Sequence, residues 1–215
     1  MIRLIQGNQR SAHDSAIKEM HVLRRIVFSD RLGWDVKVED GLEIDVFDQA
    51  DPLYLLSIDP VTNAVRGTLR LLPTTGPNML RDVFGCLLPE GEMVESSAIW
   101  ESSRFAVHPT YVEERSSNRL NRTTGELFAG LVEVGLLAGL TQIVSVYDAR
   151  MRRVLKQAGY PAEVIGVPQR IGSVMTYAGL GEVSEAALAR IREAAGIEGS
   201  VLETASIEAA IAHAA

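Results

Sequence analysis

The sequence predicts an α/β (α+β) fold, a single domain built on one mixed central sheet with helices on both faces. Three observations support this prediction. Short apolar runs typical of strands recur along the chain, segments with helical spacing lie between several of them, and hydrophobic residues make up 47% of the 215 residues. Helices that alternate with strands are typical of a sheet covered by helices. A chain of this length suits one domain, and its composition supports a sizeable core.

The expected elements follow one another in short segments. Strands are predicted at residues 1–6, 52–58, 64–73, 98–107, 142–147, 162–167 and 171–179. Helices are predicted at residues 11–31, 126–140 and 149–159, and further alanine-rich helices after residue 184. The acidic stretch 35–51 shows no regular period and is interpreted as a long surface loop. Loops of that length are usually functional or disordered.

The composition limits the possible partners and compartment. There are 21 Lys and Arg against 28 Asp and Glu, so the formal net charge is −7, which argues against nucleic acid as the main partner. The single cysteine, Cys86, allows no disulfide within the chain and fits a reducing cytoplasm. The amino terminus lacks the apolar segment of a signal peptide, and the longest apolar stretch, 127–140, is too short to span a bilayer. We therefore expect a cytoplasmic protein without integral membrane association.

No metal site is expected. The four histidines lack the usual ligand spacings, and no glycine-rich phosphate-binding motif is present. Cys86 has apolar neighbours, which favours an inert packed thiol over a nucleophile.

The predicted strand 98–107 carries two charges in its middle, Glu101 and Arg104. Charged groups are rarely buried unless they are paired or used. Side chains alternate between the faces of a regular strand, so Glu101 and Arg104 would lie on opposite sides. A β-bulge near residues 101–104 would bring them to one face, and bulges are common beside active sites. The pattern leaves open whether the two residues form a structural ion pair or a catalytic acid–base site.

The first 110 residues contain further charged and aromatic residues at positions of interest. Arg24 and Phe28 are four apart on a predicted helix face, Trp34 follows, and Arg70 lies in an apolar strand. Asp45 and Asp48 lie in the acidic stretch. Each one taken singly also fits a solvated charge or a core aromatic. Together they suggest a cleft for a polar, zwitterionic ligand.

Four ordered segments carry a resemblance to a known family: residues 23–36, 43–56, 67–80 and 99–107. With these segments the chain closely resembles the acyl-homoserine-lactone synthases, the autoinducer synthases of bacterial quorum sensing. The resemblance implies a fold related to the GCN5-type N-acetyltransferases, with a splayed central sheet. We expect a catalytic domain over residues 1–183, and the alanine-rich pattern beyond it predicts a peripheral helical tail over residues 184–215.

The resemblance further implies an acyltransferase reaction. S-adenosyl-L-methionine is the co-substrate, an acyl thioester is the donor, and no prosthetic group takes part. The amine of S-adenosylmethionine attacks the thioester to form an amide, and the lactone then closes with release of methylthioadenosine. The implied catalytic residues are Glu101, as general base, and Arg104. The implied S-adenosylmethionine-binding residues are Arg24, Phe28, Trp34, Asp45, Asp48 and Arg70.

Two more sites follow from the resemblance together with the residue pattern. The acyl chain is expected to contact Phe128, Leu131, Ser145 and Met151, where the Ser145 hydroxyl would favour a 3-oxo chain. A basic helix surface of Arg150, Arg152, Arg153 and Lys156 is expected to dock an acidic acyl-carrier protein. No glycine-rich pyrophosphate-binding turn precedes the helix at 126, which favours a carrier-protein donor over acyl-CoA.

Two other functions stay open from the sequence. One is a generic acyl-CoA-dependent N-acyltransferase, which would release no methylthioadenosine. The other is a non-catalytic small-molecule sensor that uses the same pocket. The chain length and C3 oxidation state of the acyl group, the donor type and the oligomeric state are not specified by the residues.

Overall fold

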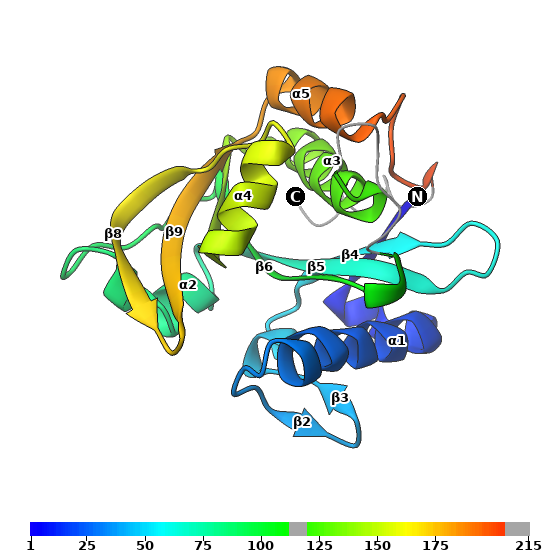
Figure 1. Cartoon of the computed structure of the whole chain (residues 1–215), viewed down its shortest axis with the longest axis horizontal. Helices are drawn as coiled ribbons and strands as arrows, with labels where there is room; N and C mark the ends of the chain where they lie inside the picture. Colours follow the sequence, from blue (N-terminus) through cyan, green and yellow to red (C-terminus); the bar gives the residue numbers. More distant parts are fainter. Residues whose placement is uncertain (112–119, 205–215) are drawn as a thin grey trace.

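A computed structural model of the chain describes residues 1–111 and 120–204. Its centre is a seven-stranded sheet in the order β1-β4-β5-β6-β7-β9-β8 (Figure 1). The strands are β1 (Ile2–Gln6), β4 (Leu53–Ile58), β5 (Val65–Pro73), β6 (Ile99–Val107), β7 (Gln142–Asp148), β8 (Glu163–Ile171) and β9 (Val174–Glu182). β6 and β7 are parallel and every other neighbouring pair is antiparallel, which confirms the predicted mixed sheet.

Helices cover both faces of the sheet, as predicted. One face carries α1 (Asp14–Arg24), the small hairpin of β2 (Val38–Glu39) and β3 (Leu42–Glu43), and the single turn α2 (Met79–Asp82) (Figure 1). The other face carries α3 (Arg122–Leu137), α4 (Ala149–Gln157) and α5 (Glu185–Ala195). α1 continues into the π-helical η2 (Arg25–Arg31), and short 3-10 turns are η1 (Gly7–His13), η3 (Val46–Gln49), η4 (Gly85–Leu87) and η5 (Pro109–Tyr111).

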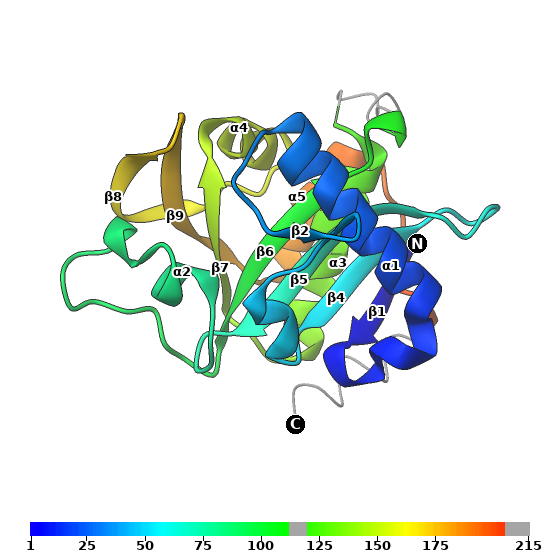
Figure 2. The same ribbon diagram turned by 90° about the horizontal axis from the view of Figure 1, so that it is seen from below.

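The parallel pair β6–β7 opens part of the way along its length. The two strands pair only from Ile99 opposite Gln142 to Ser102 opposite Ser145, although both continue beyond these residues. Figure 2 shows β6 and β7 diverging from this point. The splayed sheet implied by the family resemblance is therefore present, with Ser102 and Ser145 at the fork.

The carboxyl-terminal segment is not peripheral as far as residue 204. α5 packs on α3 so closely that a Cβ on Gly125 would lie 2.4 Å from the Cβ of Ala195. Leu188 and Ile191 belong to the main core, because the apolar face of α5 covers α3 where α3 is apolar nearly all round. The division at residue 183 remains a prediction, and the rest of the predicted tail, residues 205–215, lies outside the described residues.

The stretch predicted as an irregular loop, 35–51, is instead largely folded. It forms the β2–β3 hairpin and η3, whose first turn has reciprocal caps between Asp45 and Asp48. Glu43, Phe47 and Asp48 are buried. The prediction was wrong because Glu43 and Asp48 are buried and pair with guanidinium groups that come from distant parts of the chain.

Candidate active site

The predicted β-bulge is present in β6, centred on Arg104. Arg70 of β5 faces Ser103 and Thr68 faces Ala106, so β6 has one extra residue where the register shifts. Arg104 has a φ of 54°, in the left-handed region that non-glycine residues rarely occupy. A bulge re-aims side chains and increases the local twist of the strand.

The bulge sorts the side chains of β6 onto the two faces. Trp100 packs in the core under α3, and Phe105 stacks on Phe128 of α3 with ring centroids 5.0 Å apart. Glu101 instead accepts hydrogen bonds from α2, and Arg104 forms ion pairs on the α1 face. An unbroken strand would have placed Phe105 with Glu101 and turned Arg104 away, so the bulge brings the two charged residues to one face.

Three guanidinium groups and three carboxylates form one connected cluster beside α1, termed here the charge network. Its members are Arg24, Arg70, Arg104, Glu43, Asp45 and Asp48. Arg24 forms a bidentate pair with Asp48, with N–O distances of 2.8 and 2.9 Å. Arg70 and the Tyr54 hydroxyl also donate to Asp48, at 3.0 and 2.9 Å. The equal number of opposite charges offsets the cost of burying them.

Two buried members of this region were missed by the sequence analysis. Glu43 of β3 accepts a hydrogen bond from Arg104 at 3.1 Å and also pairs with the Nε of Arg24. His21 of α1 lies beside it, and its Nδ1 is 2.8 Å from the backbone oxygen of Glu43. The sequence gives two signals for Glu43. It lies in the acidic stretch, which equally well describes exposed Glu39, and it begins segment 43–56, which carries the family resemblance.

The network opens to the surface at one side. The side chain of Asp45 is 15% exposed and that of Arg104 is 11% exposed, whereas the side chains of Arg24, Asp48 and Arg70 are each 1% exposed. Asp45 accepts from Arg70 at 2.5 and 3.0 Å, and the guanidinium of Arg104 lies 2.7 Å from it. A bound molecule would therefore reach Asp45 and Arg104 before the other members.

In the interior of the network, opposite charges shift the pKa values of the buried groups more than burial does. Burial acts to raise the pKa of Asp48, but the hydrogen bonds and charge of Arg24 hold that pKa well below its usual range. Burial acts to lower the pKa of Arg24, and Asp48 and Glu43 raise it instead. Both groups are therefore charged throughout the physiological range.

Glu101 differs from the network carboxylates. It is 1% exposed, and its two oxygens accept the backbone N–H groups of Met79, at 3.0 Å, and Leu80, at 2.6 Å. Within residues 1–111 and 120–204, no cation lies in salt-bridge range of this carboxylate. Burial raises the pKa of Glu101 above its ordinary value, against the lowering effects of the two N–H groups, Arg70 and Arg104. A buried carboxylate with a raised pKa suits proton transfer near neutral pH.

The two predicted aromatic residues lie at the open side of the network. Phe28, in η2, is buried and stacks on Trp34 with ring centroids 5.3 Å apart. The guanidinium of Arg104 lies over the ring of Phe28, 5.5 Å from its centroid. Trp34 is 41% exposed. The structure thus brings all eight predicted charged and aromatic residues to one face of the sheet.

The four predicted acyl-contact residues lie on the opposite face. Phe128 and Leu131 of α3 are buried in the main core, and Met151 of α4 packs against it. Ser145 shares its face of β7 with Ile143 and Tyr147, which belong to that same core. Ser145 therefore does not lie on the α2 face, and it adjoins the fork between β6 and β7.

The predicted docking residues are exposed on α4, which Asp148 caps by accepting from the backbone N–H groups of Arg150 and Met151. Arg152 lies over the ring of Tyr177, 5.0 Å from its centroid. Arg150, Arg153 and Lys156 are exposed on the same helix.

Two general properties of the described residues bear on the site. Among them no group of three or more His, Cys, Asp or Glu side chains is placed to hold a metal ion. In the same part of the chain, no helix is long and apolar enough to cross a membrane.

Comparison with known proteins places this arrangement in a family. The sequence profile of the autoinducer synthases matches residues 8–191. An acyl-homoserine-lactone synthase of Agrobacterium fabrum is 40% identical over 178 residues, covering 83% of this chain and 84% of that protein. The solved acyl-homoserine-lactone synthase LasI has a TM-score of 0.78 at 29% identity, covering 93% of this chain and 98% of its own. BjaI, a CoA-dependent acyl-homoserine lactone synthase solved with SAM and isopentyl-CoA, has a TM-score of 0.83 at 24% identity over 98% of both chains and so shows the shared fold. This chain belongs to the autoinducer synthase family, the acyl-homoserine-lactone synthases.

Proposed function

We propose that the protein makes an N-acyl-L-homoserine lactone from S-adenosyl-L-methionine and an acyl thioester, with Glu101 as the general base. One observation carries the proposal. The guanidiniums and carboxylates of the charge network neutralise one another, while Glu101, beside them, is buried and held only by backbone N–H groups in the described residues. Among the carboxylates of the site, Glu101 is therefore the one that is not committed to an ion pair in the described residues.

The co-substrate binds at the open side of the network in this proposal. The exposed Trp34, stacked on Phe28, covers the adenosyl group. Asp45 attracts the ammonium and sulfonium charges, and Arg104 attracts the carboxylate. The buried Arg24, Asp48 and Arg70 contribute by holding Asp45 and Arg104 in place. In this proposal, residues 33–51 lie over the bound co-substrate, exclude water from the site and so limit thioester hydrolysis.

The chemistry needs one proton to leave the ammonium before nitrogen can attack. Glu101 accepts that proton, directly or through a water. The new N–C bond forms as the thioester C–S bond breaks, and the thiol leaves with a proton. The substrate carboxylate then attacks the carbon next to the sulfonium, which closes the lactone and releases methylthioadenosine. In this proposal, backbone N–H groups at the β6 bulge stabilise the tetrahedral oxyanion.

The purified full chain tests this function directly. We expect mass spectrometry to detect an acyl-homoserine lactone and methylthioadenosine in equal amounts after incubation with S-adenosylmethionine and acyl donors. Acylation without methylthioadenosine would indicate a generic N-acyltransferase, and ligand binding without turnover would indicate a sensor. Parallel reactions with acyl-carrier protein and acyl-CoA donors identify the donor; we propose the carrier protein.

The acyl chain is proposed to enter at the fork between β6 and β7 and to contact Phe128, Leu131 and Met151. Ser145 lies at that fork on the same face. We expect Ser145→Ala to reduce the preference for a 3-oxo chain over an unsubstituted chain of equal length by roughly tenfold, because one hydrogen bond to the chain is lost. Competition between the two donors measures the preference. An unchanged ratio of 3-oxo to unsubstituted product in Ser145→Ala would show that Ser145 does not select the acyl chain.

The exposed basic surface of α4 is proposed to dock the acidic carrier protein. We expect Arg150→Glu combined with Arg153→Glu to raise the KM for the acyl-carrier protein by about tenfold or more and to weaken its dependence on salt. Steady-state kinetics at several ionic strengths measure both effects. Lys18→Glu combined with Arg31→Glu reverses two exposed charges on α1 and η2, which lie on the other side of the sheet from α4, and serves as the control. Equal KM values in the two double variants would refute the docking surface.

A further inference from the structure

Glu101 is oriented mainly by two backbone groups of α2. Its oxygens accept from Met79 N at 3.0 Å and Leu80 N at 2.6 Å. The charged groups facing it are Arg70 of the neighbouring strand β5 and Arg104 of its own strand β6, and neither lies in ion-pair contact with it in the described structure. The direction in which Glu101 points therefore depends on where α2 holds its two N–H groups.

Asn78 organises the turn that carries these donors. It is 1% exposed, and its side-chain oxygen accepts the backbone N–H of Arg81 at 3.0 Å. Its side-chain nitrogen donates to the backbone oxygens of Thr74, at 3.3 Å, and Gly76, at 3.0 Å. One amide thus joins the segment before α2 to α2 itself: its nitrogen donates to Thr74 and Gly76, and its oxygen accepts from Arg81 within the turn.

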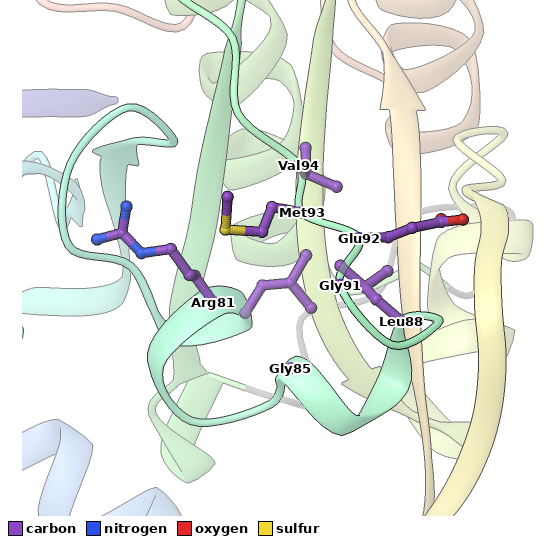
Figure 3. Close-up of a pocket in the computed structure, with 8 residues that line it drawn as sticks. Arg81, Gly85, Leu88, Gly91, Glu92, Met93 and Val94 are labelled. Atoms are coloured by element: carbon purple, nitrogen blue, oxygen red, sulfur yellow. The ribbon is translucent and has the colours of Figure 1, made fainter.

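α2 is also supported by Leu80, which is 2% exposed and packs in a cluster with Leu87, Val144 and Ala178. A hollow of about 260 Å³ borders the turn, lined by Leu80, Arg81, Gly85, Leu88 and residues 91–94 (Figure 3). α2 itself is only four residues long. An isolated turn of that length is not stable on its own, so tertiary contacts must hold it. Leu80 contacts both Glu101 and the hollow: its backbone N–H donates to Glu101, and its side chain borders the hollow.

We propose that Asn78 is a positioning residue for the reaction, which holds the N–H groups of Met79 and Leu80 against Glu101 and so orients the carboxylate that accepts the substrate proton. In the part of the chain that the structure describes, Asn78 forms no hydrogen bond with Glu101 or with the charge network. It acts through the backbone of α2. This inference rests on the proposed role of Glu101.

The pH dependence of kcat/KM in Asn78→Ala tests the proposal. The two N–H groups stabilise the ionised carboxylate, so a displaced α2 moves the acid limb of the profile to higher pH. We expect a shift of about one pH unit, a roughly tenfold loss of kcat/KM below the limb, and an unchanged KM for S-adenosylmethionine. Asn78→Ser keeps an acceptor for Arg81 N but lacks the two amide donors, so its limb should lie between those of wild type and Asn78→Ala.

A matched control separates positioning from stability. Ser184 caps α5 by accepting the backbone N–H of Ala187, far from the site. Ser184→Ala removes a cap of the same kind, so it should lower Tm without moving the acid limb. A wild-type limb in folded Asn78→Ala overturns the proposal, and if that variant does not fold, a wild-type limb in Asn78→Ser overturns it. If Glu101→Gln stays active, the assignment of Glu101 as the general base is wrong. If Glu101→Gln is inactive but the acid limb of the Asn78 variants does not shift, only the role of Asn78 is refuted.

Discussion

Glu101→Gln is expected to reduce kcat by about 10²- to 10⁴-fold, the usual contribution of a positioned general base. The amide is close in size to the carboxylate but accepts no proton at neutral pH. Its oxygen can still accept from one of the two N–H groups of α2. The measurement is the initial rate of lactone formation at saturating S-adenosylmethionine, together with the Kd of S-adenosylmethionine.

The pH profile gives the second part of this prediction. Burial raises the pKa of Glu101, and only its ionised form accepts a proton. The wild-type kcat/KM should therefore be low at pH values below that raised pKa and increase as the pH rises through it. Glu92→Gln changes an exposed carboxylate and is the control that should leave kcat unaltered. Near-wild-type turnover in a folded Glu101→Gln protein would show that another group takes the proton.

Asp48→Asn is expected to destabilise the fold by about 3–5 kcal/mol, the typical cost of breaking a buried ion pair from one side. Asp48 accepts from Arg24, Arg70 and Tyr54 in the interior of the charge network. Without its charge, two buried guanidiniums share fewer negative partners. The free energy of unfolding in urea measures the loss, and the exposed Asp35→Asn in the same region should change it by less than about 0.5 kcal/mol.

The sign of the pH effect follows from the depressed pKa of Asp48. A carboxylate whose pKa is lower in the folded state contributes stability above its unfolded pKa, near 3.9, and loses that contribution as pH falls toward the folded value. Wild type should therefore lose stability below about pH 4 more steeply than Asp48→Asn. Equal stability of the two proteins at neutral pH would mean that the network contributes no net free energy through Asp48.

Local pattern predicted most of the fold and the bulge of β6. The alternation of side chains in a strand is a local rule, so the conflict between Glu101 and Arg104 was visible before any contact was known. The bulge between Ser103 and Ala106 resolves that conflict as expected. The family resemblance supplied the roles of these residues, which periodicity alone left open.

The acidic stretch shows where local pattern fails. Glu39 and Glu43 lie in one hairpin with similar neighbours, yet the side chain of Glu39 is 70% exposed and that of Glu43 is fully buried. The difference comes from Arg24 and Arg104, which reach Glu43 from α1 and β6. Asn78 is a similar case, because an asparagine in a loop carries no sign that its amide organises the donors of Glu101.

The sequence by itself determined which ionisable groups are available, the order of strands and helices, and the need for a bulge. Only the tertiary structure decided which charges pair and which buried carboxylate is left without an ion-pair partner among the described residues. The reason is physical: the free energy of a buried charge depends on its desolvation and on partners in space, and Arg104 and Glu43 are 61 residues apart in the chain.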